Sequence, residues 1–259
     1  MAGAIVTGAA GGVGRRTCDL LGREGWELTL VDIDAERLEE TGRALSAEGH
    51  AVRGRIAGDV SDPACAEEAV EVSDGGDGGV GALVNAAAIL GAGAAGDVSL
   101  EDFDRVVAVN LRGTFLMMRA VLQRMRPRRR GTIVNVASVD AFVGEPQLAA
   151  YCASKGGVLQ LTRAAAVDHA RERIRINCVC PGAIDTPLFR QSVNERAADP
   201  ETALRAAAER HPIGRLLTPD DVAGAIAFLV DDGSAAITGS ALVVDGGLSA
   251  TWQFSAINK

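Results

Sequence analysis

The chain has 259 residues, of which 47% are apolar and 23% are charged, a composition typical of a globular protein and unlike that of a disordered one. Its net charge of -8 is spread along the sequence, which argues against a nucleic-acid partner. The most membrane-like window, residues 80–96, is shorter than the roughly 20 apolar residues that a membrane span requires.

Seven short apolar runs alternate with longer segments of helical period, which predicts an α/β fold. Because several runs are apolar throughout, we expect one parallel sheet of about seven strands, doubly wound, with helices covering both faces. The expected strands cover residues 4–7, 27–31, 52–57, 82–85, 132–136, 175–179 and 241–244.

Capping residues mark where several helices begin and end. The pairs Asp62-Pro63 and Thr218-Pro219 each place a capping side chain before a proline at the first helical position. The segment from Ser99 to Asp102 resembles a capping box. The basic cluster at residues 124–130 closes another expected helix, where cations are favourable, and is interpreted as a solvated cap.

The five cysteines form an odd set without the paired spacing of a metal site or a disulfide framework. We therefore expect buried free thiols in a reducing compartment and no metal. Arginines follow the apolar N-terminal stretch instead of preceding it, so we expect no signal peptide and a cytoplasmic protein. The cysteines are Cys18, Cys65, Cys152, Cys178 and Cys180.

The glycine-rich stretch TGAAGGVGRR comes directly after the first expected strand. In it, Gly8, Gly12 and Gly14 allow a tight turn, close approach of the backbone to a pyrophosphate and close packing of the next helix. Asp32 ends the second expected strand about 20 residues later, where a carboxylate accepts hydrogen bonds from the adenosine ribose. This combination predicts a dinucleotide site.

The cofactor is predicted to be NAD rather than NADP. The Asp32 carboxylate would repel a 2′-phosphate, and neither Gly11 nor Ile33 supplies a cation for that phosphate.

With these features, the chain resembles the short-chain dehydrogenase/reductase family over nearly its whole length. The resemblance implies a single NAD-binding Rossmann domain over residues 1–259 and a homo-oligomer, a tetramer or a dimer, joined through helical faces near residues 110–125 and 158–169. The motifs are TGAAGGVG at residues 7–14, Asp59-Val60, LVNAAAI at 83–89, VNLRGTF at 109–115, VNVAS at 134–138, YCASK at 151–155, PGAIDT at 181–186 and ITGSALVVDGG at 237–247.

The resemblance also implies the roles of individual residues. Ser138 would bond the substrate oxygen, Tyr151 would be the acid/base, Lys155 would activate it, and Asn110 would hold a water that connects Lys155 to solvent. The implied dinucleotide site consists of Gly8, Gly12, Val13, Gly14, Asp32, Ile33, Asp59, Val60, Asn85, Ala86, Ala87, Tyr151, Lys155, Pro181, Gly182, Ile184 and Thr186.

Tyr151 is the only tyrosine of the chain, and Lys155 is one of its two lysines. Residues four apart share one face of a helix, so both side chains point into the same site. A cation about 4 Å away contributes roughly 4 kcal/mol at an effective dielectric constant of about 20, or about three pKa units. We therefore expect Lys155 to bring the pKa of the phenol close to neutrality.

One departure from the family pattern follows the fourth expected strand. The family usually has Asn-Asn-Ala-Gly there, whereas in this chain Asn85 is followed by three alanines at residues 86–88. The loss of the second amide is expected to loosen the sheet or the adenosine-side wall, and alanine in place of glycine narrows access near the nicotinamide. Activity is expected to survive because no proton-transfer group is affected.

The substrate is expected to be a compact or cyclic secondary alcohol or its ketone. A helical lid at about residues 187–213 would order over the site. We expect an apolar substrate slot formed by Ile89, Leu90, Phe142, Leu188 and Phe189 next to Ser138. Asp140 and Gln147 could bond a second hydroxyl of the substrate.

Two other functions remain open at this point. A 3-oxoacyl carrier protein reductase-like enzyme could use Arg173 and the arginines at residues 128–130 to receive an acidic carrier, although such enzymes usually prefer NADPH. A dinucleotide-binding sensor without turnover is the alternative of another class. The complete set of Asn110, Ser138, Tyr151 and Lys155 favours an NAD-dependent alcohol dehydrogenase or ketone reductase.

Overall fold

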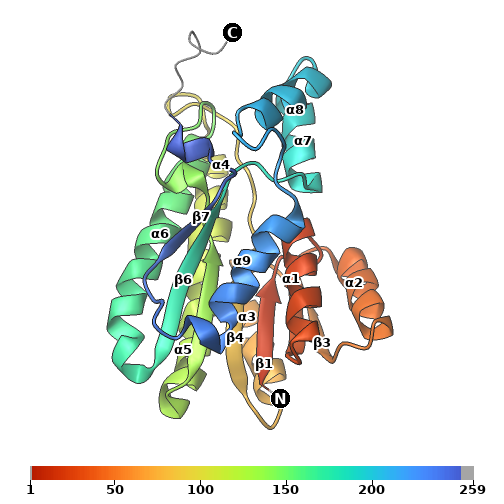
Figure 1. Cartoon of the computed structure of the whole chain (residues 1–259), viewed down its shortest axis with the longest axis vertical. Coiled ribbons are helices and arrows are strands. Elements are labelled where there is room, and N and C mark those ends of the chain that lie inside the picture. The colour runs from red at the N-terminus through yellow and green to blue at the C-terminus, as the bar shows by residue number, and fades with distance from the viewer. Residues whose placement is uncertain (1, 252–259) are drawn as a thin grey trace.

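A computed structural model describes residues 2–251 of the chain. Seven parallel strands form one sheet in the order β3-β2-β1-β4-β5-β6-β7, as Figure 1 shows. The strands are β1 (Gly3–Thr7), β2 (Glu27–Asp32), β3 (Val52–Ala57), β4 (Val80–Asn85), β5 (Gly131–Val136), β6 (Ile174–Pro181) and β7 (Ala241–Val244).

This order confirms the predicted doubly wound α/β fold. The chain runs outward from β1 through β2 to β3 and then crosses back to β4, which pairs with the other side of β1. Open sheets of this kind bind ligands beyond the carboxyl ends of the strands, at the point where the strand order reverses. The predicted strands fall on the observed ones, which extend one or two residues further at several ends.

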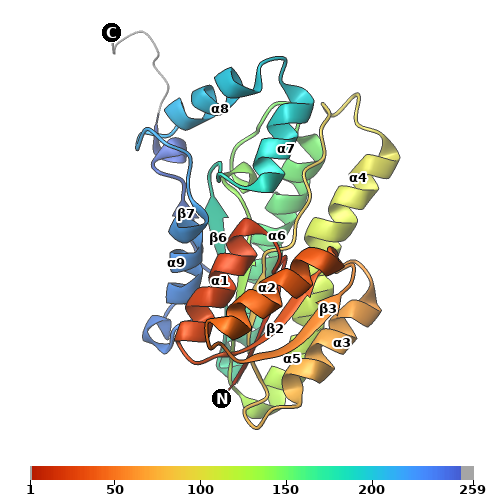
Figure 2. The ribbon, with the colours of Figure 1, turned by 90° about the vertical axis from the view of Figure 1, so that its right-hand side faces the viewer.

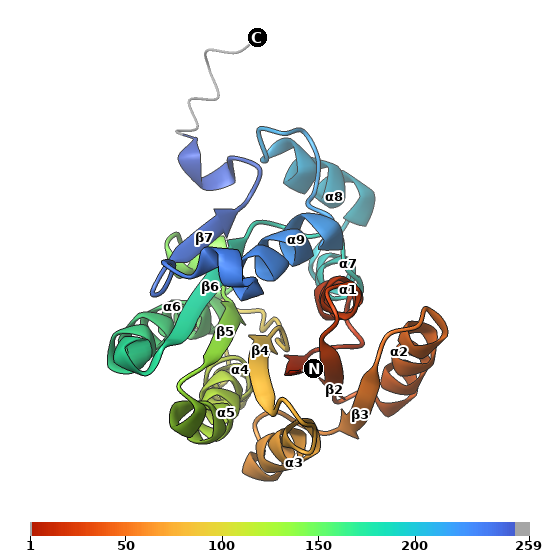
Figure 3. The same ribbon diagram turned by 60° about the horizontal axis from the view of Figure 1, so that its bottom comes forward.

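Helices cover both faces of the sheet (Figure 3). One core packs β-strand residues such as Val6 against α1, α2 and α9, and the other packs residues such as Ile5 against α3, α5 and α6. Adjacent strand residues thus bury opposite faces, which explains why β1 is buried throughout. The helices are α1 (Gly12–Arg23), α2 (Ala35–Ala47), α3 (Pro63–Asp74), α4 (Leu100–Val107), α5 (Thr114–Arg128), α6 (Ala149–His169), α7 (Pro187–Arg196), α8 (Pro200–Glu209) and α9 (Pro219–Val230).

The predicted helix starts are confirmed. The Asp62 side chain accepts from the Ala64 amide at the start of α3, Ser99 accepts from the Asp102 amide at α4, and Thr218 forms a capping box with Asp221 at α9. The basic cluster ends α5, where Arg129 has a φ of 51° and closes the helix in the left-handed conformation.

The predicted lid segment is helical and contains two helices, α7 and α8. Figures 1 and 2 show α7 and α8 beyond the carboxyl ends of the strands. The pairs Thr186-Pro187 and Asp199-Pro200 begin these helices, with each capping side chain accepting a backbone amide. Only Ser192 of α7 is buried, and α8 buries no residue. The two helices therefore add little to either core.

All five cysteines are free thiols. Four of them are buried as predicted, but Cys152 is partly exposed. The Sγ atoms of Cys178 and Cys180 lie 3.9 Å apart on the buried face of β6. Within residues 2–251, no helix combines the length and apolar character needed to cross a membrane.

Candidate active site

The turn between β1 and α1 fits the backbone closely and leaves no room for side chains. Gly8 has a φ of 66°, and a Cβ there would lie 2.8 Å from the Ala87 nitrogen. A Cβ on Gly14 would overlap the Gly8 carbonyl oxygen. The N-cap residue Gly11 offers no side chain to the amides at the start of α1, so these amides are available to an anion.

Asp32, at the carboxyl end of β2, faces this turn. Its carboxylate accepts hydrogen bonds from the Ala10 amide at 2.9 Å and the Asp34 amide at 3.1 Å. Arg37 of α2 donates to the Ala10 carbonyl at 3.0 Å and lines the same cavity as Asp32. Arg37 was not predicted, because it is adjacent in sequence neither to the glycines nor to Asp32. A cofactor preference must therefore take both charges into account.

A cavity of about 310 Å³ runs from the glycine turn to the carboxyl end of β5. It brings together most of the predicted dinucleotide residues with Arg37 and Arg105, two cations that were not predicted. Asn85 and Asn110 are buried behind its wall and do not line it. The predicted residues that line the cavity are Gly8, Gly12, Val13, Gly14, Asp32, Ile33, Asp59, Val60, Ala86, Ala87, Ile89, Ser138, Tyr151, Lys155, Pro181, Gly182, Ile184, Thr186 and Leu188.

Ser138, Tyr151 and Lys155 meet at one end of this cavity. Ser138 follows β5 and caps a short 3₁₀ turn by accepting from the Asp140 amide at 3.1 Å. Tyr151 and Lys155 lie one helical turn apart in α6, with the Lys155 Nζ atom 5.5 Å from the centre of the tyrosine ring. The Lys155 ammonium is 2% exposed and donates to the Val136 carbonyl at 2.7 Å.

The electrostatics of this pair differ from the expectation. Burial raises the pKa of Tyr151, the charge of Asp140 raises it further, and a hydrogen bond from Ser138 opposes both. Burial lowers the pKa of Lys155 to about 8. The expected neutral-range phenol was wrong for the protein alone, because the ammonium lies over the ring and bonds a backbone carbonyl instead of contacting the phenolic oxygen.

Asp140 adds a negative charge near Tyr151 and Lys155. Burial raises the pKa of its carboxyl group and so does the charge of Glu145, while Ser138, Arg210 and Lys155 lower it. Glu145 itself forms a two-point ion pair with Arg210, at 2.9 and 3.1 Å. The charge of Asp140 therefore acts on the Tyr151 phenol, and Asp140 is itself influenced by an ion pair that joins the end of α8 to the segment before α6.

Asn110 is held by three hydrogen bonds. It lies in a π-helical segment, Ala108–Gly113, between α4 and α5. Its Oδ1 accepts from the Ile89 amide at 2.9 Å, and its Nδ2 donates to the Ile89 carbonyl at 3.0 Å and the Ser154 hydroxyl at 3.1 Å. The side chain thus connects the loop after β4 to α6, and its role in holding a water remains a prediction.

The alanine-substituted loop after β4 is anchored by other side chains. The Thr7 hydroxyl accepts from the amides of Ala86 and Ala87 at 3.1 and 3.2 Å. Asn85 donates to the Asn135 side chain at 2.9 Å, and Asn135 donates onward to Thr162 at 2.9 Å. Hydrogen bonds of other side chains thus connect β1, β4, β5 and α6 where the second asparagine is missing.

Of the residues predicted for the substrate, Ile89, Ser138 and Leu188 line the cavity, and the others do not. Phe142 and Leu188 are 46% and 41% exposed. Gln147 is exposed and has a φ of 63°, which turns the chain into α6. The predicted apolar slot is thus an open surface between the 3₁₀ turn and α7.

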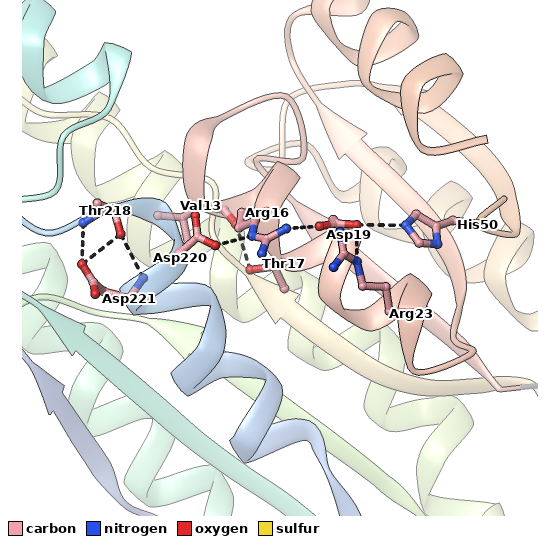
Figure 4. Close-up of polar contacts among 9 residues, drawn as sticks. All are labelled: Val13, Arg16, Thr17, Asp19, Arg23, His50, Thr218, Asp220 and Asp221. Atoms are coloured by element: carbon pink, nitrogen blue, oxygen red, sulfur yellow. Dashed lines mark hydrogen bonds and ion pairs between the residues drawn. The ribbon is translucent and has the colours of Figure 1, made fainter. Parts of the chain in front are cut away.

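An ion-pair network connects α1 to the start of α9 and to His50 (Figure 4). Arg16 bonds Asp220 at the start of α9 and also bonds Asp19, which is 7% exposed. Asp19 further accepts from Arg23 at 2.9 Å and lies 3.0 Å from the His50 Nε2 atom. Although Glu48 also approaches His50, the arginines already neutralise Asp19, so this cluster does not support a metal site.

We expect Asp19→Asn to lower the free energy of unfolding by about 2 kcal/mol at pH 7, less than for a fully buried pair because Arg23 is 61% exposed. Burial raises the pKa of Asp19, but the bonds from His50 and Arg23 and the charges of both arginines outweigh it and lower the pKa. A lowered carboxyl pKa stabilises above the unfolded value of about 4, and this contribution is lost on further acidification. Urea unfolding should show the difference between the two proteins shrinking below that pH; a constant difference would contradict this.

A family model described as enoyl-(acyl carrier protein) reductase matches residues 8–249. 2-(S)-hydroxypropyl-CoM dehydrogenase 3 of Xanthobacter autotrophicus (strain ATCC BAA-1158 / Py2) is 39% identical over 245 residues, 95% of each chain. Cyclopentanol dehydrogenase of Comamonas testosteroni is 40% identical over 249 residues, 95% of this chain and 96% of that one. A solved structure of actinorhodin polyketide ketoreductase with NADPH has a TM-score of 0.92 at 35% identity and covers 96% of this chain and 98% of its own.

Proposed function

Because the chain belongs to the short-chain dehydrogenase/reductase family of oxidoreductases, we propose that it interconverts a secondary alcohol and its ketone with NAD as hydride carrier and Tyr151 as acid/base. The observation that carries this proposal is the meeting of Ser138, Tyr151 and Lys155 in the cavity that begins at the glycine turn.

The residues present fit a nicotinamide dinucleotide. Gly8 and Gly14 have no Cβ atom that would fill the space beside the backbone. The backbone amides at the start of α1 have no side-chain cap and can donate to a pyrophosphate. Asp32 is placed for the adenosine ribose, and Lys155 keeps donors beyond its bond to Val136 for the second ribose. When bound, the dinucleotide supplies the carbon that accepts or donates hydride.

The chain's own residues handle the proton. The Ser138 hydroxyl orients the substrate oxygen, and the Tyr151 hydroxyl takes the proton from an alcohol or gives it to a ketone. A cationic Lys155 favours the phenolate, whereas the negative charge of Asp140 opposes it. Ketone reduction, in which the tyrosine begins protonated, is therefore the easier direction at neutral pH for the groups of this chain.

We expect kcat/KM to be higher with NAD than with NADP, because the Asp32 carboxylate would repel a 2′-phosphate, while the Arg37 guanidinium already bonds the Ala10 carbonyl. Asp32→Asn removes the charge but keeps an acceptor oxygen. It should shift the ratio of kcat/KM values toward NADP by about tenfold.

Arg37→Gln is the matched control for this shift and should leave the NAD reaction nearly unchanged. A wild-type preference for NADP that disappears in Arg37→Gln would show instead that the arginine selects the cofactor, and would contradict the proposal.

The substrate proposed is a compact or cyclic secondary alcohol. The relative named cyclopentanol dehydrogenase supports this class, as does the open apolar surface formed by Phe142 and Leu188. A panel of linear and cyclic secondary alcohols and ketones, followed by NADH absorbance, tests it. Turnover restricted to thioester-linked substrates would contradict it.

The whole chain is proposed to act as one dinucleotide-binding domain with residues 187–213 as a lid, in a cytoplasmic homo-oligomer. The low burial of α7 and α8 supports the lid. Exposed apolar side chains on neighbouring helices support the oligomer, notably Phe103 of α4, Phe115 of α5 and Val167 of α6.

The alternative of a carrier-protein reductase finds less support in the charges. Arg128 is paired with Asp74 at 2.6 Å, Arg130 approaches Asp232 at 3.5 Å, and Arg129 donates to the Arg171 carbonyl. These partners occupy three of the four arginines expected to receive an acidic carrier. The non-catalytic sensor is tested by the Tyr151 variant described in the Discussion.

A further inference from the structure

His211, which immediately follows α8, is 1% exposed and was not among the predicted site residues. A buried imidazole requires partners for both ring nitrogens, and this one has them. Its Nδ1 lies 2.8 Å from the Ala207 carbonyl oxygen, and its Nε2 lies 3.2 Å from the Ala183 amide nitrogen. A carbonyl only accepts and an amide only donates, so the ring is neutral with its proton on Nδ1.

The two hydrogen bonds of the His211 ring join the proposed lid to the loop that lines the cavity. Ala207 belongs to the last turn of α8, whose carbonyls lack partners within the helix, so the Nδ1 proton fixes the end of the lid. Ala183 follows Gly182 in the loop between β6 and α7, which lines the cavity through Pro181, Gly182 and Ile184. The ring is therefore a direct polar link between lid and cavity wall.

The ring also determines the space available to the loop. A Cβ on Gly182 would lie 2.6 Å from the His211 Nε2 atom, so the imidazole packs directly against the glycine backbone. Asp245, after β7, is the charged group that faces the ring, and its own carboxylate is bonded to the amides of Gly247 and Ser249. The ring thus lies between a fixed turn and the cavity loop.

The bonds of Ala183 continue into the chain after the lid. Its carbonyl accepts from the Leu217 amide at 2.9 Å, and Leu217 in turn accepts from the Asp185 amide at 2.8 Å. The loop is therefore held on one side by backbone bonds and on the other by His211. Because α8 buries no residue, few apolar contacts could replace this link if the imidazole were lost.

We propose that His211 is a positioning residue that makes the order of the α7–α8 lid and the shape of the dinucleotide-binding loop at residues 181–186 depend on each other. The inference rests on the proposed binding of a dinucleotide. Through this link, a dinucleotide that contacts the loop also stabilises the lid, and a disordered lid weakens binding of the dinucleotide by the same factor.

Three variants separate the two bonds. His211→Phe removes both while keeping a ring, His211→Asn keeps a donor near the Nδ1 position, and His211→Gln keeps an acceptor near the Nε2 position. NADH binding to each full-length protein is measured by fluorescence titration. Hydrogen exchange of residues 200–209 is followed with and without NADH, and thermal unfolding is recorded as a check on folding.

For the wild-type protein we expect NADH to slow exchange in α8. In His211→Phe and His211→Asn, which both lose the acceptor for Ala183, the Kd for NADH should rise about tenfold and the response of α8 should disappear. His211→Gln should restore most of the NADH affinity. The KM for the dinucleotide should rise more than kcat falls, since no proton-transfer group changes.

Folded variants with a lower Tm but an unchanged Kd and an unchanged α8 response would overturn the inference and leave a purely structural histidine. If the phenylalanine variant does not fold, the comparison of His211→Asn with His211→Gln decides the same question. Absence of NADH binding by the wild-type protein would overturn the proposed function, and this inference with it.

Discussion

Tyr151→Phe is expected to lower kcat by on the order of a thousandfold in both directions while leaving the Kd for NADH within about twofold of the wild-type value. The substitution removes only the phenolic oxygen, and the ring continues to pack beside the Lys155 ammonium. In ketone reduction, no group is then left to protonate the alkoxide that forms. In alcohol oxidation, no group is left to accept the proton of the hydroxyl. Stopped-flow measurement of NADH oxidation and fluorescence titration test the two parts separately.

Cys152→Ser is a suitable control for this variant, because it changes the neighbouring residue without touching the proton path. Unchanged turnover in Tyr151→Phe would remove the proposed mechanism. Turnover that is absent in the wild-type protein with every alcohol and ketone tested, together with intact NADH binding, would favour the sensor.

Lys155→Met is expected to lower kcat/KM for NADH by on the order of a hundredfold, because it removes a cation while keeping a side chain of similar length in a buried position. The loss has a pH signature. Burial lowers the pKa of Lys155 to about 8, so the cationic form is present below this pH and is lost above it. In the wild-type protein kcat/KM for NADH, measured with saturating ketone, should therefore fall above about pH 8.

The methionine variant should lack this fall at high pH, because no titrating group remains at position 155. Lys155→Arg provides the second comparison. An arginine keeps the charge at every accessible pH and cannot release a proton, so any activity it retains should also be independent of pH in this range. A fall that persists unchanged in both variants would assign the titration to another group.

Much of the fold could be predicted because local and global signals agree in this chain. The strand that ends at Thr7 has apolar side chains on both of its faces. Strands buried between two layers of helices in a parallel sheet require this pattern. Capping pairs such as Thr218-Pro219 marked helix starts for the same reason. The same capping pattern at Thr186-Pro187 and Asp199-Pro200 marks the starts of α7 and α8, and so divides the lid segment into its two helices.

The meeting of Ser138 with the Tyr151-Lys155 pair was predictable in outline, since a strand end and a helical spacing of four define it. The electrostatics were not. Whether Lys155 contacts the phenolic oxygen or the Val136 carbonyl depends on a side-chain conformation that spacing does not determine. Asp140 and Arg37 act on the site through tertiary proximity, and no local pattern distinguishes them from surface charges.

The absence of buried side chains in α8 has a consequence for how such a protein diversifies. Substitutions in residues 200–209 remove no core packing, so their effect on the folding free energy is small. The strands and the glycine turn, where a single added methyl group collides with backbone, have no such freedom. Related chains are therefore expected to differ from this one more often in this helix than in the strands or the glycine turn.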